Sequence, residues 1–266
     1  MRSSTIILPS GCESLNRVLW RVDLPALTAF GVSRGVIPEG GDLGYAIHSS
    51  LLALYGQGAP KPFRLVHRPR DGAFNLLAYT RLTPLALNDR AAVQATLVRD
   101  FSRAAKGIDP DTLTVSPLPL SWQAGRRLAF EARLRPMVRT TRNDPRSSEG
   151  GREIDAFIAA SLKASDKRLY REDVYRDWVV NAFVRSGAVA VEREDIRFTQ
   201  MTRTRLFTGD RGGHVQRIDK GIEGPLICVE GLLTILEPAG FTPFLARGMG
   251  RHRSFGFGMV QLAPAP

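Results

Sequence analysis

Residues 247–262 read RGMGRHRSFGFGMVQL, with four glycines set among arginines and two phenylalanines. The stretch has no Gly-Lys-Ser/Thr and runs into an alternating, strand-like segment, which excludes a Walker loop and a Rossmann fingerprint. A backbone with few Cβ atoms can approach a ligand closely and direct N–H groups at an anion. The flanking Arg247, Arg251, His252 and Arg253 favour phosphate of a polynucleotide. Glycines that serve only a bulge or tight packing are the alternative.

The charge of the chain points to the same class of ligand. Its 266 residues include 37 Lys and Arg against 26 Asp and Glu, a formal net charge of +11 with a pI near 10.4. Such a balance is typical of proteins that bind a polyanion. Of the 37 basic residues 32 are Arg, whose planar fork suits phosphate and stacking on bases, although a GC-rich genome would produce the same bias. Nucleic acid, RNA above all, is the predicted partner.

Other function classes lack support in the sequence. Cys12 and Cys228 lie far apart and share no metal-ligand spacing with the four histidines, so we expect neither a disulfide framework nor a metal site, and no cofactor. No apolar run approaches the roughly 20 residues that a membrane helix needs, and the N-terminus does not resemble a signal peptide. The expected compartment is the cytoplasm.

Periodicity and turn signals divide the chain into two similar halves. In the first half we expect strand 16–22, helices 23–34 and 42–56, strands 61–68 and 74–82, helix 89–105 and a closing strand 126–138. After a basic linker, 139–151, we expect helices 152–164 and 172–187, strands within 188–207 and at 224–236, helix 239–248 and a last strand 254–262.

This order predicts an α+β protein of two consecutive βαββαβ units, each an antiparallel sheet with helices on one face. The predicted domains are 1–138 and 152–266, joined by the linker 139–151.

Several segments together resemble one known family. They are DLGYAIHSSLLALYG at 42–56, GGREIDAFIAA at 150–160, EDVYRDWVVNAFVRSGAVAVE at 172–192 and VEGLLTILEPAGFTPFLARGMGRHRSFGFGM at 229–259. The last ends in G-x-G-R-x-x-x-F-G-F-G-M, which looks like the signature loop of repeat-associated RNA-processing proteins. Over nearly its whole length the chain resembles the CasE family, the endoribonucleases of the type I-E Cascade complex.

The resemblance implies a fold and an activity. It implies two tandem ferredoxin-like (RRM-like) domains that bind the hairpin of the CRISPR repeat. It also implies cleavage of precursor CRISPR RNA 3′ of that hairpin, without metal, by attack of a ribose 2′-OH that leaves a 2′,3′-cyclic phosphate. The enzyme would then stay on the mature guide RNA beside other Cascade subunits. A non-catalytic RNA-binding subunit of a CRISPR effector complex is the alternative, and a generic tandem RNA-binding protein explains the charge but not the matched segments.

Histidine is the side chain best able to move a proton near neutral pH. Tyr45 and His48 are three residues apart in a predicted helix, so they share one face. A histidine beside Leu51 is otherwise more often structural, but the resemblance implies that His48 is catalytic, as base or acid, with Tyr45 at the reacting phosphate. The other histidines, in a basic strand, in a turn and in the glycine-rich stretch, are weaker candidates: His67, His214 and His252.

Arginines form the predicted RNA-binding set, because an A-form duplex exposes phosphates and 2′-OH groups rather than its major-groove edges. The densest cluster lies around the linker and comprises Arg133, Arg135, Arg139, Arg142 and Arg146. The glycine-rich stretch contributes Arg247, Gly248, Gly250, Arg251 and Arg253. A charge-rich loop that is only solvated is the alternative for the first group.

Overall fold

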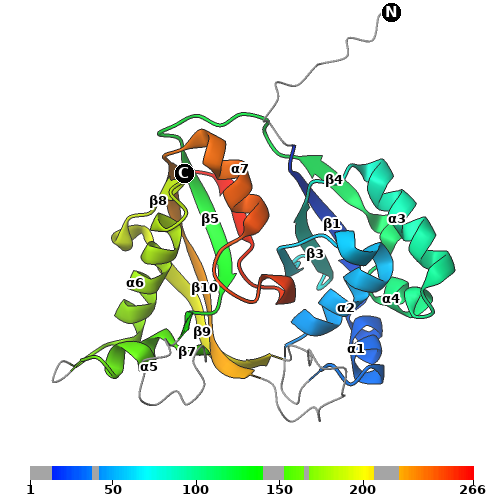
Figure 1. The fold of residues 1–266 in the computed structure, drawn as a ribbon, viewed down its shortest axis with the longest axis horizontal. Helices are drawn as coiled ribbons and strands as arrows, with labels where there is room; N and C mark the ends of the chain where they lie inside the picture. Colours follow the sequence, from blue (N-terminus) through cyan, green and yellow to red (C-terminus); the bar gives the residue numbers. More distant parts are fainter. Residues whose placement is uncertain (1–13, 38–41, 140–152, 165–167, 207–221) are drawn as a thin grey trace, which may run out of the picture.

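The computed structural model describes residues 14–37, 42–139, 153–164, 168–206 and 222–266. Arg142, Arg146 and His214 therefore lie outside the described residues, as does most of the predicted linker. Figure 1 shows two α+β halves side by side, each a sheet with helices packed on it. The mixed helix and antiparallel sheet architecture predicted from the sequence is confirmed.

The first half contains an antiparallel sheet with the strand order β2-β3-β1-β4. Its elements are β1 Asn16–Val22, α1 Leu24–Ser33, α2 Gly44–Tyr55, β2 Phe63–His67, β3 Phe74–Thr80, α3 Pro84–Leu97, α4 Phe101–Gly107 and β4 Thr114–Pro117. Strand and helix order together define a ferredoxin-like unit. Where one helix was expected over 89–105, two are present, because the chain becomes extended at Val98.

Local sequence signals explain these elements. Asp23 and Thr83 cap α1 and α3, and each is followed by a proline in the first helical turn, where the missing N–H costs nothing. Burial alternates along β1, so that Val18 and Trp20 point into the core with Leu51 of α2.

The second half repeats the arrangement with the strand order β11-β5-β10-β8, and β9 also pairs with β10. Its elements are β5 Arg127–Leu134, β6 Met137–Arg139, β7 Glu153–Asp155, α5 Ala156–Ser161, α6 Arg171–Val184, β8 Val189–Ala190, β9 Arg197–Leu206, β10 Ile222–Ile235, α7 Pro238–Arg247 and β11 Val260–Pro264. Read from β5, the principal elements run β5, α6, β9, β10, α7, β11, again a ferredoxin-like unit. The tandem fold predicted from the sequence is thus confirmed.

The role predicted for strand 126–138 is wrong. Instead of closing the first sheet, β5 pairs with both β10 and β11 of the second. Every second side chain of β5 is buried in the second core, from Leu128 to Leu134, while β4 already occupies the first sheet's edge beside β1. We therefore propose that the two domains meet in residues 118–126, between β4 and β5, and not after residue 138.

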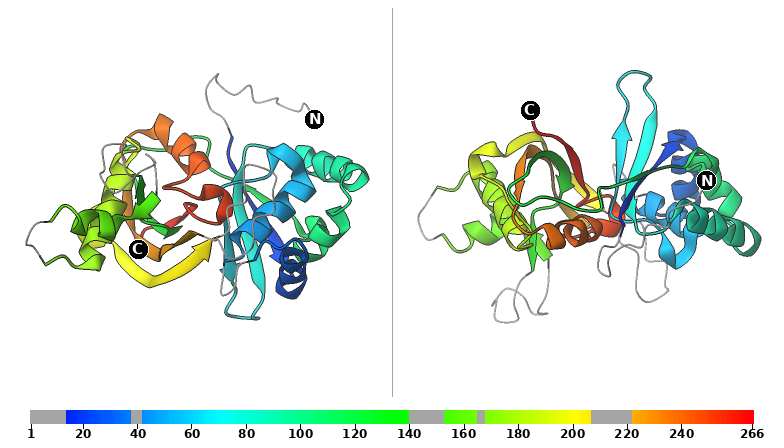
Figure 2. Two further views of the ribbon diagram at one scale, coloured as in Figure 1. Left: turned by 60° about the horizontal axis from the view of Figure 1, so that its bottom comes forward. Right: turned by 90° about the horizontal axis from the view of Figure 1, so that it is seen from above.

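The two halves are in direct contact. The hydroxyl of Tyr79, on β3, donates a hydrogen bond to the carbonyl of Val260 on β11 at 2.8 Å. Arg64 of β2 forms an ion pair with Glu131 on the face of β5 that its helices leave open. Figure 2 shows the two halves from further sides, with the β2–β3 hairpin extending past the rest of the first sheet. The contacts fix the first half against strands β5 and β11 of the second half.

Candidate active site

Helix α2 carries the two residues predicted to act on the substrate. Asp42 Oδ1 accepts a hydrogen bond from the N–H of Gly44 at 2.6 Å, which satisfies one of the free donors at the helix start. Tyr45 and His48 follow on one face and are both half-buried, with 5.8 Å between their ring centroids. The predicted shared face is therefore present.

The glycine-rich stretch folds into a compact loop rather than the expected continuous strand over 254–262. After α7 the N–H of Met249 donates to the carbonyl of Gly258 at 2.8 Å, and the N–H of Gly258 donates to the carbonyl of Arg133 at the same distance. Gly258 has φ of +78°, and a Cβ there would overlap the carbonyl of Met249. The loop thus needs glycine at this position for its own packing.

The loop places Phe255 against α2. Its ring stacks on Tyr45 at 5.5 Å and meets His48 edge-on at 5.3 Å. Gly44 makes this approach possible, because a Cβ there would overlap the carbonyl of Phe255. Two segments about two hundred residues apart therefore build one aromatic cluster, Tyr45–His48–Phe255, at the end of α2 that faces the second half (Figure 1).

The surroundings of His48 favour its neutral form. Burial lowers the pKa of its imidazole, and the positive charge of Lys61 lowers it further. Both residues line a pocket of about 170 Å³ together with Gln57 and Phe63. An unprotonated imidazole beside an ammonium group can accept a proton from a hydroxyl group while the ammonium attracts a phosphate.

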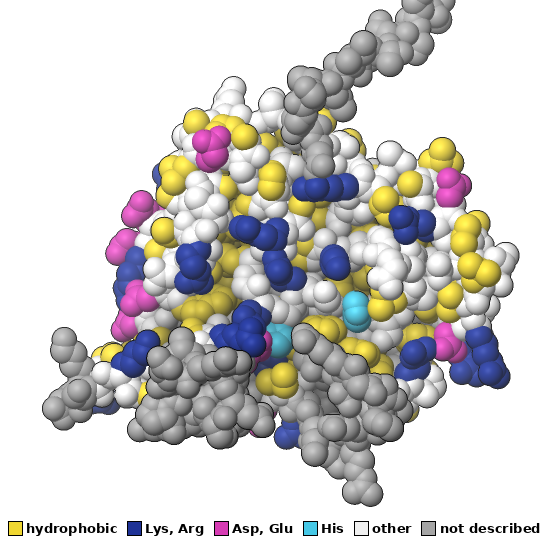
Figure 3. Space-filling model, in the orientation of Figure 1, with side chains coloured by type: hydrophobic (Ala, Val, Ile, Leu, Met, Phe, Trp, Pro, Cys, Tyr) yellow, Lys and Arg dark blue, Asp and Glu magenta, His cyan; other side chains and the backbone are white. Residues whose placement is uncertain are grey.

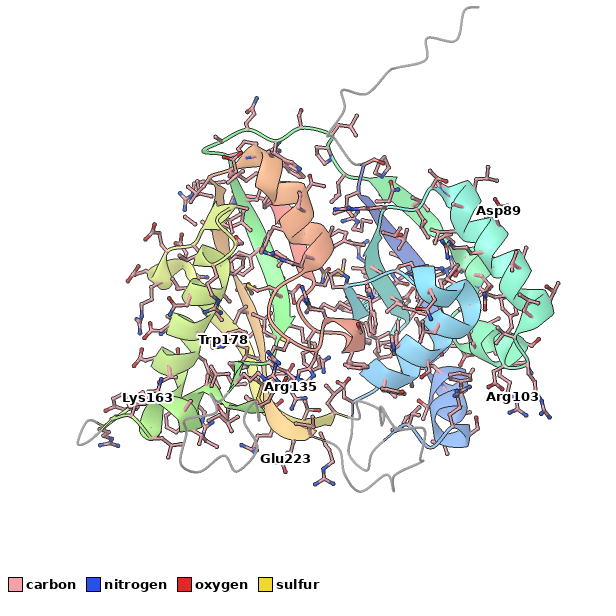
Figure 4. The ribbon with its side chains drawn as sticks, viewed as in Figure 1. Asp89, Arg103, Arg135, Lys163, Trp178 and Glu223 are labelled. Atoms are coloured by element: carbon pink, nitrogen blue, oxygen red, sulfur yellow. The ribbon has the colours of Figure 1, made fainter. Side chains whose placement is uncertain are left out.

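Two of the arginines predicted to contact RNA pack over the ring of Phe257 in the loop. Arg133 pairs with Asp42, and its guanidinium lies 4.2 Å from the ring centre of Phe257. Arg135 is 1 % exposed, and its Nη2 donates to the carbonyl of Ile222 at 3.0 Å. Burial lowers the pKa of Arg135 to about 10. Figure 4 shows Arg135 at the lower end of the second sheet, near Glu223. In this structure the Arg135 side chain presents almost no surface to an RNA duplex.

A second charged cluster fixes the loop from its other side. Glu153 of β7 lies 2.8 Å from Nε2 of His252 and accepts a hydrogen bond from Arg251, and these two contacts lower the pKa of Glu153 to about 2. His252 is the one non-glycine residue with a positive φ, +59°, in the described part of the chain. The contact with Glu153 explains how His252 keeps this less favourable backbone conformation.

Replacing Glu153 with Gln is expected to lower the melting temperature by a few degrees at pH 7, because the charge-assisted hydrogen bonds to Arg251 and His252 are lost. The carboxylate stabilises the fold above its usual pKa near 4.5, and this contribution is lost as the pH falls towards about 2. Thermal unfolding of both proteins between pH 7 and pH 3 measures the effect. Equal melting temperatures at pH 7 would contradict it.

The remaining predicted residues are dispersed. Arg247 and Gly250 are exposed, Gly248 is buried, and Arg253 donates from Nη1 to the carbonyl of Arg247 at 2.9 Å. Arg139 is exposed at the end of β6. Figure 3 shows Lys and Arg side chains along the middle of one face, between the two halves, with histidines among them. These exposed cations stay candidates for RNA contact.

Sequence reasoning did not predict the roles of Phe255 and Lys61. The F-G-F-G pattern was a signal for a special loop, but nothing in it indicates which helix the phenylalanine contacts. His67, an exposed residue of β2, contacts Phe74 with ring centroids 5.0 Å apart and lies outside the aromatic cluster. Within the described ranges there is no group of three or more His, Cys, Asp or Glu placed to hold a metal ion, and no helix long and apolar enough to cross a membrane.

Fold and site together define a protein of two tandem ferredoxin-like domains with a glycine-rich loop packed between them. A family model described as CRISPR associated protein matches residues 33–264, so the chain belongs to this family of CRISPR-associated proteins. The resemblance to the CasE family is confirmed. No curated protein matches the chain.

Solved structures with the same fold cover 94 % of this chain and the whole of their own. One is titled a CRISPR endoribonuclease Cse3 bound to a 19-nucleotide RNA, at a TM-score of 0.60 and 14 % identity. Another is Thermus thermophilus Cse3 bound to an RNA that represents a pre-cleavage complex, at a TM-score of 0.60 and 16 % identity. A third is a CRISPR-associated protein from Thermus thermophilus, at a TM-score of 0.50 and 15 % identity. At these identities the likeness shows the fold.

Proposed function

We propose that this protein is a metal-independent endoribonuclease that binds the hairpin of a CRISPR repeat and cleaves precursor CRISPR RNA on its 3′ side. It then stays on the mature guide RNA within a Cascade-type complex. The observation that carries the proposal is the cluster of Tyr45, His48 and Phe255, which the glycine-rich loop builds beside the pocket that contains Lys61. Membership of a CRISPR-associated family and a fold shared with Cse3 endoribonucleases support it.

The proposed step is an intramolecular transesterification. Neutral His48 takes the proton of the ribose 2′-OH, the 2′ oxygen bonds to phosphorus, and the bond from phosphorus to the 5′ oxygen breaks. The leaving 5′ oxygen takes a proton from water, and protonated His48 returns its proton to the hydroxide that remains. The products are a 2′,3′-cyclic phosphate and a 5′-OH end. Tyr45 orients the phosphate, and Lys61 stabilises the negative charge that develops on its oxygens.

Incubation of the purified protein with its cognate repeat RNA in EDTA tests the proposal. We expect one cut, just 3′ of the hairpin, and no cut in an RNA of equal length whose hairpin is disrupted. Because phosphate contacts dominate, binding should weaken by orders of magnitude from low to physiological salt. Tight binding without cleavage would instead indicate a non-catalytic subunit of a CRISPR effector complex.

The pH dependence of cleavage follows from the lowered pKa of His48. As the pH falls through that pKa the imidazole becomes protonated and can no longer accept the 2′-OH proton. We therefore expect the single-turnover rate to be constant above about pH 6.5, the usual pKa of histidine, and to decline at lower pH with a midpoint below it. Rates measured from pH 4.5 to 8.5 give the midpoint, and a midpoint above 6.5 would contradict a desolvated His48 as base.

A further inference from the structure

A second, larger pocket lies between the two halves. It has a volume of about 410 Å³, within the range of roughly 300–1,000 Å³ that is typical of small-molecule sites. Its walls come from the turn after α2, from the end of β3 and from the last turns of α7. We call it the interdomain pocket.

The interdomain pocket shares a wall with the pocket of His48. The segment from Gln57 to Lys61 lines both, apart from Gly58, which lines the interdomain pocket alone. A phosphate held at Lys61 beside His48 therefore has the interdomain pocket immediately next to it. The base of a nucleotide attached to that phosphate can therefore reach the interdomain pocket without a large displacement of the RNA backbone.

The lining suits a nucleotide. Apolar surface comes from both halves, with Pro60 and Leu82 on one side and Ala246 on the other. Exposed cations stand around it, Lys61 and Arg81 from the first half and Arg247 from the second. An unpaired RNA nucleotide has a flat base and a phosphate on each side of its ribose. Its base fits the apolar walls of the pocket, and its phosphates fit the Lys and Arg residues around the rim.

Hydrogen bonds fix the walls in place. The N–H of Lys61 donates to the carbonyl of Tyr79, and the N–H of Tyr79 donates to the carbonyl of Pro62, both at 3.1 Å. The Tyr79 hydroxyl holds the second half through Val260, and Arg253 holds the carbonyl of Arg247. The site is therefore formed before the ligand arrives, which limits the entropic cost of binding.

We propose that the interdomain pocket binds the base of one unpaired nucleotide next to the scissile phosphate, and so positions that phosphate at His48. The inference rests on the proposed endoribonuclease function and deepens it. It assigns Arg81, Leu82 and Ala246, which lie outside the glycine-rich loop and helix α2, to substrate positioning.

The test couples a change in the RNA with a change in the protein. The probe is the cognate repeat RNA with a 2′-deoxynucleotide at the cut site, so that it binds without being cleaved, in a series with one abasic position among the unpaired nucleotides that flank the cut. For the wild-type protein, one abasic position should raise Kd about tenfold. For Ala246→Trp, which fills the pocket, the same abasic change should raise Kd less than about twofold. Ala95→Trp, on the exposed part of α3, is the matched control and should retain the tenfold effect.

Equal abasic effects for wild type and Ala246→Trp at every position would overturn the proposal. Photocrosslinking of the wild-type protein with 4-thiouridine at the same position does not depend on whether the variant folds. A crosslink to residues 79–82 or 243–247 supports the pocket, and crosslinks only elsewhere reject it. Because both measurements use RNA binding, they separate the two ideas. If the wild-type protein cuts RNA but the abasic effect is the same in Ala246→Trp, the pocket proposal alone is rejected. If the abasic effect disappears in Ala246→Trp but the wild-type protein does not cut RNA, the endoribonuclease proposal is rejected.

Discussion

Replacing His48 with alanine is expected to lower the single-turnover cleavage rate about 10²–10⁴-fold, the usual contribution of a positioned general base. RNA affinity should change less than about twofold, because His48 is half-buried and its lowered pKa favours the uncharged imidazole of the proposed ground state. Cleavage rates at saturating protein and Kd for uncleavable RNA, measured side by side, separate a catalytic effect from a binding effect.

His67→Ala is the matched control, since His67 is exposed on β2 and outside the aromatic cluster. It should cut RNA at close to the wild-type rate. A His48→Ala protein that cleaves within twofold of wild type at pH 7 would remove His48 from the mechanism. An equal loss in both variants would point to a general effect of histidine removal.

Gly44→Ala is expected to produce the second large effect. The new Cβ overlaps the carbonyl of Phe255, so either the glycine-rich loop or the start of α2 must move. Overpacking of this kind costs about 1–3 kcal/mol of folding free energy. Since Phe255 contacts both Tyr45 and His48, we also expect cleavage to fall by about tenfold or more. Chemical denaturation and single-turnover kinetics measure the two effects.

Gly240→Ala provides the control in another helix, α7. A Cβ there meets Ala188 at 3.4 Å, an ordinary contact, and alanine favours helix by up to about 1 kcal/mol over glycine. This variant should be as stable as wild type or more so, and fully active. A Gly44→Ala protein that matched it in both stability and rate would show that the loop does not depend on close contact with α2.

Much of the fold could be predicted because its signals are local. The helix around Tyr45 and His48 has a regular apolar stripe, and the repeated element order indicates two similar units. The pairing of β5 could not be read in the same way. Its alternation shows that one face is buried, but only the tertiary fold determines that the partners are β10 and β11, about 100 and about 130 residues away along the chain.

In the candidate site, too, local features could be predicted from the sequence and tertiary contacts could not. Spacing alone predicts that Tyr45 and His48 share a face, whereas the approach of Phe255 depends on the whole second domain. The charge pattern gives no comparable guide to where the arginines lie. Arg133 and Arg135 stand in a basic segment, yet one pairs with Asp42 and the other is buried beneath the loop, because an arginine's sequence context does not reveal its burial.

The most direct test of the central claim uses two repeat RNAs that differ by one oxygen atom. One is all ribose, and the other has a single 2′-deoxynucleotide immediately 5′ of the cut, both in EDTA with wild-type protein. The account predicts one cut with a 2′,3′-cyclic phosphate in the first RNA and an intact second RNA bound with similar affinity. Cleavage of the 2′-deoxy RNA at the same bond, or cleavage of the all-ribose RNA only after a divalent metal is added, would contradict it.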